Sequence, residues 1–171
     1  SLSGQIHEAR ELHEKGKPIA ARMPAVHRQG YLSGIAFLAV LGGETERAIP
    51  EMETAVSELK AANTPRILVT PLHNLGDLYL RNNQLKRAAE SFHEAIRLAA
   101  LFGMEGTVHL NRGFLGYTKA RLGQVEDGAD MLGIAKDALK DIANEHVSWL
   151  QLRLLDAEVA HMLGQTARAR R

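Results

Sequence analysis

The sequence feature that most restricts the fold is a break between helical segments that recurs about every 40 residues, a period within the range of repeat architectures. The four breaks are at Gly42-Gly43, Asn82-Asn83, Gly123 and Gly164. A helix often ends on a residue in the left-handed backbone conformation, which glycine and asparagine tolerate best. Between the breaks, apolar residues follow the i, i+3, i+4, i+7 spacing of a helix with one buried face. The sequence therefore predicts an all-α array of about eight helices in antiparallel pairs, without strands.

The predicted core consists mainly of small and aliphatic residues, because aromatic residues make up only 5% of the chain. Phe92 is one of two aromatic residues in the predicted stripes, and we expect it to lie between the two helices of its repeat and the next helix. The last repeat has an ambiguous register, because Asp156 and Ala157 both fit its small-residue position. The predicted stripes are Leu32, Ile35, Ala36 and Ala39; Ala48, Met52, Ala55, Val56 and Leu59; Leu72, Leu75, Gly76 and Tyr79; Ala88, Phe92, Ala95 and Ile96; Leu115 and Gly116; Gly128, Leu132, Ala135 and Leu139; Leu152, Leu155, Val159 and Met162, followed by Ala167 and Ala169.

The domain organisation predicted from these stripes is a single array over residues 1–171. A lone helix over 5–15, with Ile6, Ala9 and Leu12 facing inward, ends at Gly16, and the next helix begins near Pro18 or Pro24. The repeats span about 18–62, 65–102, 104–142 and 145–171, and the last one is incomplete. A helical array needs polar capping repeats at its ends, and neither end supplies one. We therefore expect the chain to be a piece of a longer protein.

One repeat carries a recognisable motif. The segment Leu72-His-Asn-Leu75-Gly76-Asp-Leu-Tyr79, followed by Ala88, Phe92 and Ala95, resembles the tetratricopeptide repeat (TPR) pattern W-x2-L-G-x2-Y and A-x3-F. The repeat length of about 40 exceeds the usual length of about 34, so residues 30–171 are similar to the extended TPR arrays of kinesin light chains. They are also similar to the arrays of bacterial peptide-sensing regulators and large ATP-binding transcription regulators. The resemblance implies a right-handed superhelical solenoid that serves as a protein- or peptide-binding scaffold.

The resemblance also implies a binding groove along the concave face, lined by the first helix of each repeat. Arg81 and Arg121 lie one repeat apart, so they occupy equivalent positions on successive first helices. Paired guanidinium groups bind carboxylates well, so an acidic or C-terminal peptide is the expected ligand, with Asn74 on its backbone. The alternative is that these residues are merely a solvated polar surface. The groove candidates are His73, Asn74, Asp77, Arg81, Tyr117, Arg121, Glu158 and His161, with Ser33 and Phe37 in the first repeat.

Composition excludes several other function classes. The net charge of +1 gives no general attraction to nucleic acid, no apolar run is long enough to span a membrane, and the absence of cysteine fits a cytoplasmic protein. The eight histidines have no metal-ligand spacing, and no phosphate-binding loop or catalytic nucleophile with a base is present. We predict no enzyme activity, no metal and no cofactor.

Two function classes remain after these exclusions. The chain is either an interaction scaffold or the effector-sensing module of a larger transcriptional or signalling regulator, in which a bound peptide or small effector shifts the superhelix between states. The ends of the array are a candidate surface for assembly into a homo-oligomer.

Overall fold

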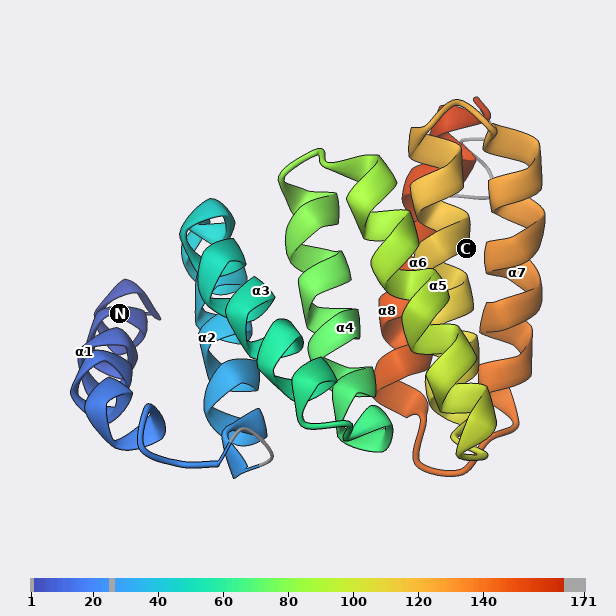
Figure 1. The fold of residues 1–171 in the computed structure, drawn as a ribbon. Helices are drawn as coiled ribbons and strands as arrows, with labels where there is room; N and C mark the ends of the chain where they lie inside the picture. Colours follow the sequence, from blue (N-terminus) through green and yellow to red (C-terminus); the bar gives the residue numbers. More distant parts are fainter. Residues whose placement is uncertain (1, 25–26, 165–171) are drawn as a thin grey trace.

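The computed structural model describes residues 2–24 and 27–164, and this part of the chain forms eight α-helices and no strand (Figure 1). Connections of a few residues make successive helices antiparallel. The predicted helix pairs and all-α fold are therefore confirmed. The helices are α1 (Leu2–Ala20), α2 (Gln29–Gly42), α3 (Thr45–Ala61), α4 (Pro65–Arg81), α5 (Leu85–Leu101), α6 (Glu105–Arg121), α7 (Val125–Lys140) and α8 (His146–Met162).

Left-handed residues end the helices at regular intervals. The predicted breaks at Gly43, Asn83, Gly123 and Gly164 have φ values of 68°, 57°, 93° and 69°. A second series, Asn63, Gly103 and Asn144, has φ values of 52°, 63° and 67° and lies midway between the first. The two series alternate along the chain, so each helix and its turn form half of one repeat.

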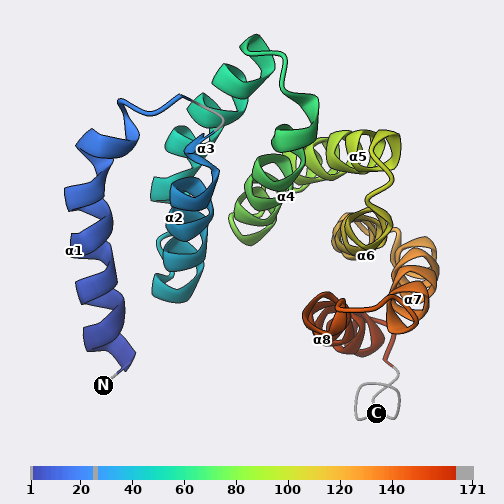
Figure 2. The ribbon, with the colours of Figure 1, turned by 90° about the horizontal axis from the view of Figure 1, so that it is seen from below.

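The helices form two curved layers (Figure 2). The first helices of the repeats, α2, α4, α6 and α8, line the inner arc, and the second helices, α3, α5 and α7, form the outer arc. Helix α1 lies beside α2 at the N-terminal end. The exposed side of α2, α4, α6 and α8 is called the concave face below, and that of α3, α5 and α7 the convex face.

Phe92 lies where the sequence predicted, between its own repeat and the next. Its side chain is 0% exposed, and its ring centroid lies 5.5 Å from that of Phe114 on α6. On α4 the ring occupies the space next to Gly76, where an added Cβ would lie 2.7 Å from Cε1 of Phe92. Small residues therefore let the helices of a pair approach closely. Most other predicted stripe residues of the three complete repeats are also buried.

The N-terminal helix is longer than predicted. It continues through Gly16 and Pro18 to Ala20, and α2 begins only at Gln29. Proline removes one backbone donor and is disruptive within a helix, but so near its end it costs α1 a single hydrogen bond. The backbone continues helically, with the Ala21 nitrogen donating to the Lys17 carbonyl at 2.9 Å. The predicted helix starts at Pro18 and Pro24 were wrong.

Two predicted core residues near the ends of the array are exposed. Leu12 is 62% exposed and Met162 is 42% exposed. For Met162 the cause is a register shift, since α8 begins slightly later within its repeat than α6 does, and Met162 therefore occupies the exposed position of Arg121. The same register places Ala157 in the small-residue position of Gly116. Ala167 and Ala169 lie outside the described residues.

Candidate functional site on the concave face

Polar contacts join each inner helix to the next. They connect α2 to α4, α4 to α6, and α6 to α8, always between side chains on neighbouring repeats. The contacts are Asn74 Nδ2 to Ser33 Oγ at 3.4 Å, His73 Nδ1 with Asn111 Oδ1 at 3.1 Å, Arg121 Nη2 to Asn83 Oδ1 at 3.1 Å, and the Tyr117 hydroxyl to the Glu158 carboxylate. The predicted groove residues are therefore linked to one another across the repeats.

Arg81 is neutralised by a residue of its own helix. Its Nε donates to both carboxylate oxygens of Asp77, each at 3.0 Å, and the two residues are one turn apart on α4. The Arg81 side chain is 47% exposed, so the pair lies at the surface. The two Nη groups of Arg81 make no hydrogen bond within the described part of the chain, which leaves donors for a ligand. Asp77 weakens the attraction of Arg81 for a negatively charged group.

Arg121 differs from Arg81 because its hydrogen-bond partners are neutral. Nη1 donates to the Tyr117 hydroxyl at 3.3 Å and Nη2 to the side chain of Asn83. Tyr117 in turn donates to Glu158 on α8, so the nearest carboxylate is one hydrogen bond further away. Burial, followed by this hydrogen bond, raises the pKa of Tyr117, which keeps its hydroxyl protonated as a donor. Arg121 is held in place by this chain of contacts.

His73 is half-buried against aromatic rings and does not lie free on the open groove. Its ring centroid is 5.0 Å from that of Phe114 and 5.9 Å from that of Phe92. Burial lowers the pKa of His73, and the hydrogen bond to Asn111 only partly opposes this. The imidazole is therefore neutral, and it forms a polar link between α4 and α6.

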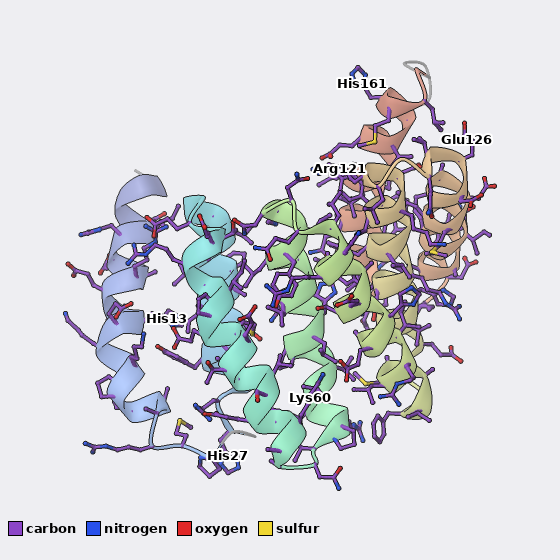
Figure 3. The ribbon with its side chains drawn as sticks, turned by 45° about the horizontal axis from the view of Figure 1, so that its top comes forward. His13, His27, Lys60, Arg121, Glu126 and His161 are labelled. Atoms are coloured by element: carbon purple, nitrogen blue, oxygen red, sulfur yellow. The ribbon has the colours of Figure 1, made fainter. Side chains whose placement is uncertain are left out.

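The exposure of the remaining candidates differs along the face. Tyr117 is buried, whereas Glu158 and His161 are exposed on α8. Figure 3 places Arg121 and His161 at the same end of the array, and both lie in the last turns of their helices.

Asn83 and Asn111 take part in the polar contacts between repeats but were not predicted as site residues. Asn83 was identified as a turn residue, but its side chain also accepts from Arg121. Asn111 is fully buried, and its Nδ2 donates to the Thr107 carbonyl at 2.8 Å while its Oδ1 contacts His73. An asparagine inside an apolar helix face was the available signal, because such a buried amide must find partners.

Metal-binding clusters and membrane spans are absent from residues 2–24 and 27–164. No group of three or more histidine, aspartate or glutamate side chains in this part of the chain is placed to hold a metal ion. No helix among the described residues is long and apolar enough to cross a membrane.

Comparisons with known proteins support the fold. No family model matches the chain. It is 36% identical over 53 residues to response regulator aspartate phosphatase A of Bacillus subtilis, a match that covers 31% of this chain and 14% of that protein. The chain therefore aligns with about one seventh of the phosphatase.

Solved structures match over nearly the whole chain. TPR-like repeats of a kinesin light chain from Podosopora anserina superpose with a TM-score of 0.71 at 21% identity, covering 99% of this chain and 84% of that one. BtubC (BKLC) from P. vanneervenii superposes with a TM-score of 0.69 at 19% identity, covering 99% and 69%. These likenesses establish that the chain has the fold of a TPR-like helical solenoid.

Proposed function

We propose that the chain is a peptide-binding module and that its concave face holds an extended segment of a partner protein through carboxylate groups. The observation that carries this proposal is Arg121, an exposed guanidinium whose hydrogen-bond partners among the described residues, Tyr117 and Asn83, are neutral. A preorganised guanidinium binds a carboxylate bidentately and loses little side-chain entropy in doing so. The TPR-like fold supports the proposal because solenoids present extended concave surfaces suited to such ligands.

Arg81 supplies a second, weaker position for a carboxylate. It is equivalent to Arg121 one repeat earlier, and its Nη groups remain available beside Asp77. Asn74 makes only a long contact to Ser33, at 3.4 Å, so its amide can turn towards a peptide backbone. Asp77 and Glu158 flank the two arginines and disfavour a densely acidic ligand. The preferred segment therefore carries one or two separated carboxylates.

A selection from a displayed library of acidic peptides, followed by titration of the best binder, tests this proposal. Arg81→Ala/Arg121→Ala should weaken binding at least tenfold and leave the melting temperature within about 2 °C, since exposed charges contribute little to stability. Arg97→Ala on the outer helix α5, where Arg97 is also exposed, is the matched control and should bind normally. Equal affinity of the double variant and the wild type would place the interface elsewhere.

A further inference from the structure

Two cavities along the array have linings that share two equivalent positions one repeat apart. The first, of about 190 Å³, lies between α3 and α5 above α4, and its lining includes Lys60 and Leu72. The second, of about 390 Å³, lies where α5 turns into α6, and its lining includes Ala100 and Arg112. Lys60 and Ala100 lie one repeat apart, as do Leu72 and Arg112, so a repeated position carries different chemistry in the two cavities.

Charged side chains that line the first cavity are paired with one another or with a neighbouring residue. Lys60 Nζ contacts Glu94 at 2.7 Å, and Arg87 forms an ion pair with Glu53, so charges bridge α3 and α5 across the opening. Leu72 closes the bottom and is 2% exposed. Each of these charges has a partner, and this cavity needs no ligand.

The second cavity lacks the cation of the first ion pair, because Ala100 takes the place of Lys60 in its lining. The ion pair between Lys60 and Glu94 therefore has no counterpart here. Apolar atoms of Ala100, Met104 and Val108 form part of the lining instead. The larger volume is consistent with this loss of bridging side chains.

Arg112 replaces the apolar Leu72 and brings an uncompensated charge to the second cavity. It is exposed, and it makes no hydrogen bond or ion pair within residues 2–24 and 27–164. A guanidinium without a carboxylate partner beside an apolar lining is suited to a ligand that supplies both an anionic group and an apolar body.

His109 adds a second polar group to the same lining. Burial, followed by the charge of Arg112, lowers its pKa, and Glu105 only partly opposes this, so the ring is neutral at pH 7. Its Nδ1 is covered and has no partner in the described structure. A buried N–H without an acceptor is costly, which favours the tautomer protonated on Nε2 and makes this nitrogen a donor.

Glu105 restricts the charge of the ligand. It lines the cavity two turns before Arg112 on the same side of α6, with His109 between them. A carboxylate there repels a multiply charged anion more strongly than a singly charged one, which gives selectivity by repulsion. A phosphate group is therefore disfavoured relative to a carboxylate.

We propose that this cavity at the α5–α6 turn binds a small monocarboxylate with an apolar body. The carboxylate is held by Arg112 and accepts from His109, and the apolar part lies against Ala100, Met104 and Val108. None of the lining residues is a groove candidate, and the site does not depend on the peptide-binding function. It gives the chain a place for a small effector, which is the property expected of a sensing module.

The test titrates the full chain, labelled with ¹⁵N, with hexanoate and with hexanamide, which has the same shape but no charge. Hexanoate should shift the amide signals of residues 100–112 and saturate with a millimolar Kd, while hexanamide should bind at least tenfold more weakly. Arg112→Leu, which introduces the residue type found at the equivalent position 72, should weaken the binding of hexanoate at least tenfold. Arg66→Leu, at an exposed arginine of α4 outside both the cavity and the groove candidates, is the matched control and should leave the hexanoate titration unchanged.

Several results would overturn the proposal. Equal shifts with hexanoate and hexanamide would show that charge is not recognised, and an unchanged titration of Arg112→Leu would place the ligand elsewhere. Inorganic phosphate binding as tightly as hexanoate would contradict the selectivity assigned to Glu105. An absence of shifts at about ten times the expected Kd would exclude the site. A matching α-helical circular dichroism spectrum and melting curve would show that Arg112→Leu is folded.

Discussion

Replacing Phe92 with alanine tests the packing between repeats, because this side chain contacts both α4 and α6. It is fully buried, against His73 on one helix and Phe114 on the other. Removing a buried aromatic side chain forfeits about 2–3 kcal/mol of transfer free energy. A residual cavity of roughly 50–100 Å³ adds about 1–2 kcal/mol at about 24 cal/mol per Å³. We therefore expect Phe92→Ala to lower the free energy of unfolding by about 3–5 kcal/mol.

Gly76 provides a second, sharper part of the same test. A methyl group there would lie 2.7–2.9 Å from three atoms of the Phe92 ring, and a ring wedged between two helices cannot move aside. Gly76→Ala alone should therefore cost about 1–3 kcal/mol through overpacking. In the Phe92→Ala background the clash is gone, and the higher helix propensity of alanine should add up to about 1 kcal/mol of stability.

Urea denaturation followed by circular dichroism at 222 nm measures all four members of this cycle. A coupling free energy below about 0.5 kcal/mol, the usual limit of additivity for independent sites, would show that the two residues do not pack as described. A loss below about 1 kcal/mol for Phe92→Ala would refute the packing itself. Ile134→Ala is the matched control, since Ile134 is exposed on the outer helix α7 and its truncation should cost about 0.5 kcal/mol or less.

Two further predictions use the same denaturation assay. Gly128→Ala should lower the free energy of unfolding by about 2 kcal/mol or more, because the added Cβ would lie 2.6 Å from the backbone nitrogen of Ala120. Gly30→Ala should be neutral or stabilising, because no atom lies within 4 Å of the added Cβ. Equal effects of the two substitutions would contradict this packing. Burial holds the pKa of His73 below its unfolded value, so the unfolded state takes up the proton first as the pH falls through about 6.5. The free energy of unfolding should therefore fall between about pH 7 and pH 5, and His73→Leu should make this fall shallower; an unchanged slope would mean that His73 is accessible.

Much of the fold could be predicted because the same pattern of turn residues and apolar stripes recurs in each repeat. The breaks at Gly43, Asn83, Gly123 and Gly164 all have left-handed geometry. The predicted repeat boundaries, after residues 62, 102 and 142, coincide with the second series of turns at Asn63, Gly103 and Asn144.

The ends of the array were less predictable for a physical reason. A helical stripe shows which side of a helix is apolar, but burial depends on a neighbour that covers that side. Leu12 and Met162 have apolar neighbours at helical spacing in the sequence, and both are exposed. The connection between α7 and α8 is also longer than the one before it, which shifts α8 relative to the repeat.

The candidate site was also predicted only in part. The repeat spacing placed Arg81 and Arg121 at equivalent positions, the resemblance to TPR arrays implied the concave face, and both residues are exposed. It could not show that His73 and Tyr117 are covered by the adjoining repeats, because this depends on how closely α4, α6 and α8 pack. It also could not pair Arg121 with Asn83, since that contact joins a helix end to the turn of the preceding repeat.

Departures from the repeat are therefore the best guide to function in this chain. Positions that keep the same small or apolar character in every repeat, such as Gly76 and Gly116, serve the packing that all repeats share. A charged residue at an apolar position gains nothing from that packing, and its cost must be offset by a partner or by solvent. Arg112, in place of Leu72, has no partner within the described residues and lines a cavity. By this reasoning it is a stronger candidate for ligand binding than Arg81, whose charge Asp77 already compensates.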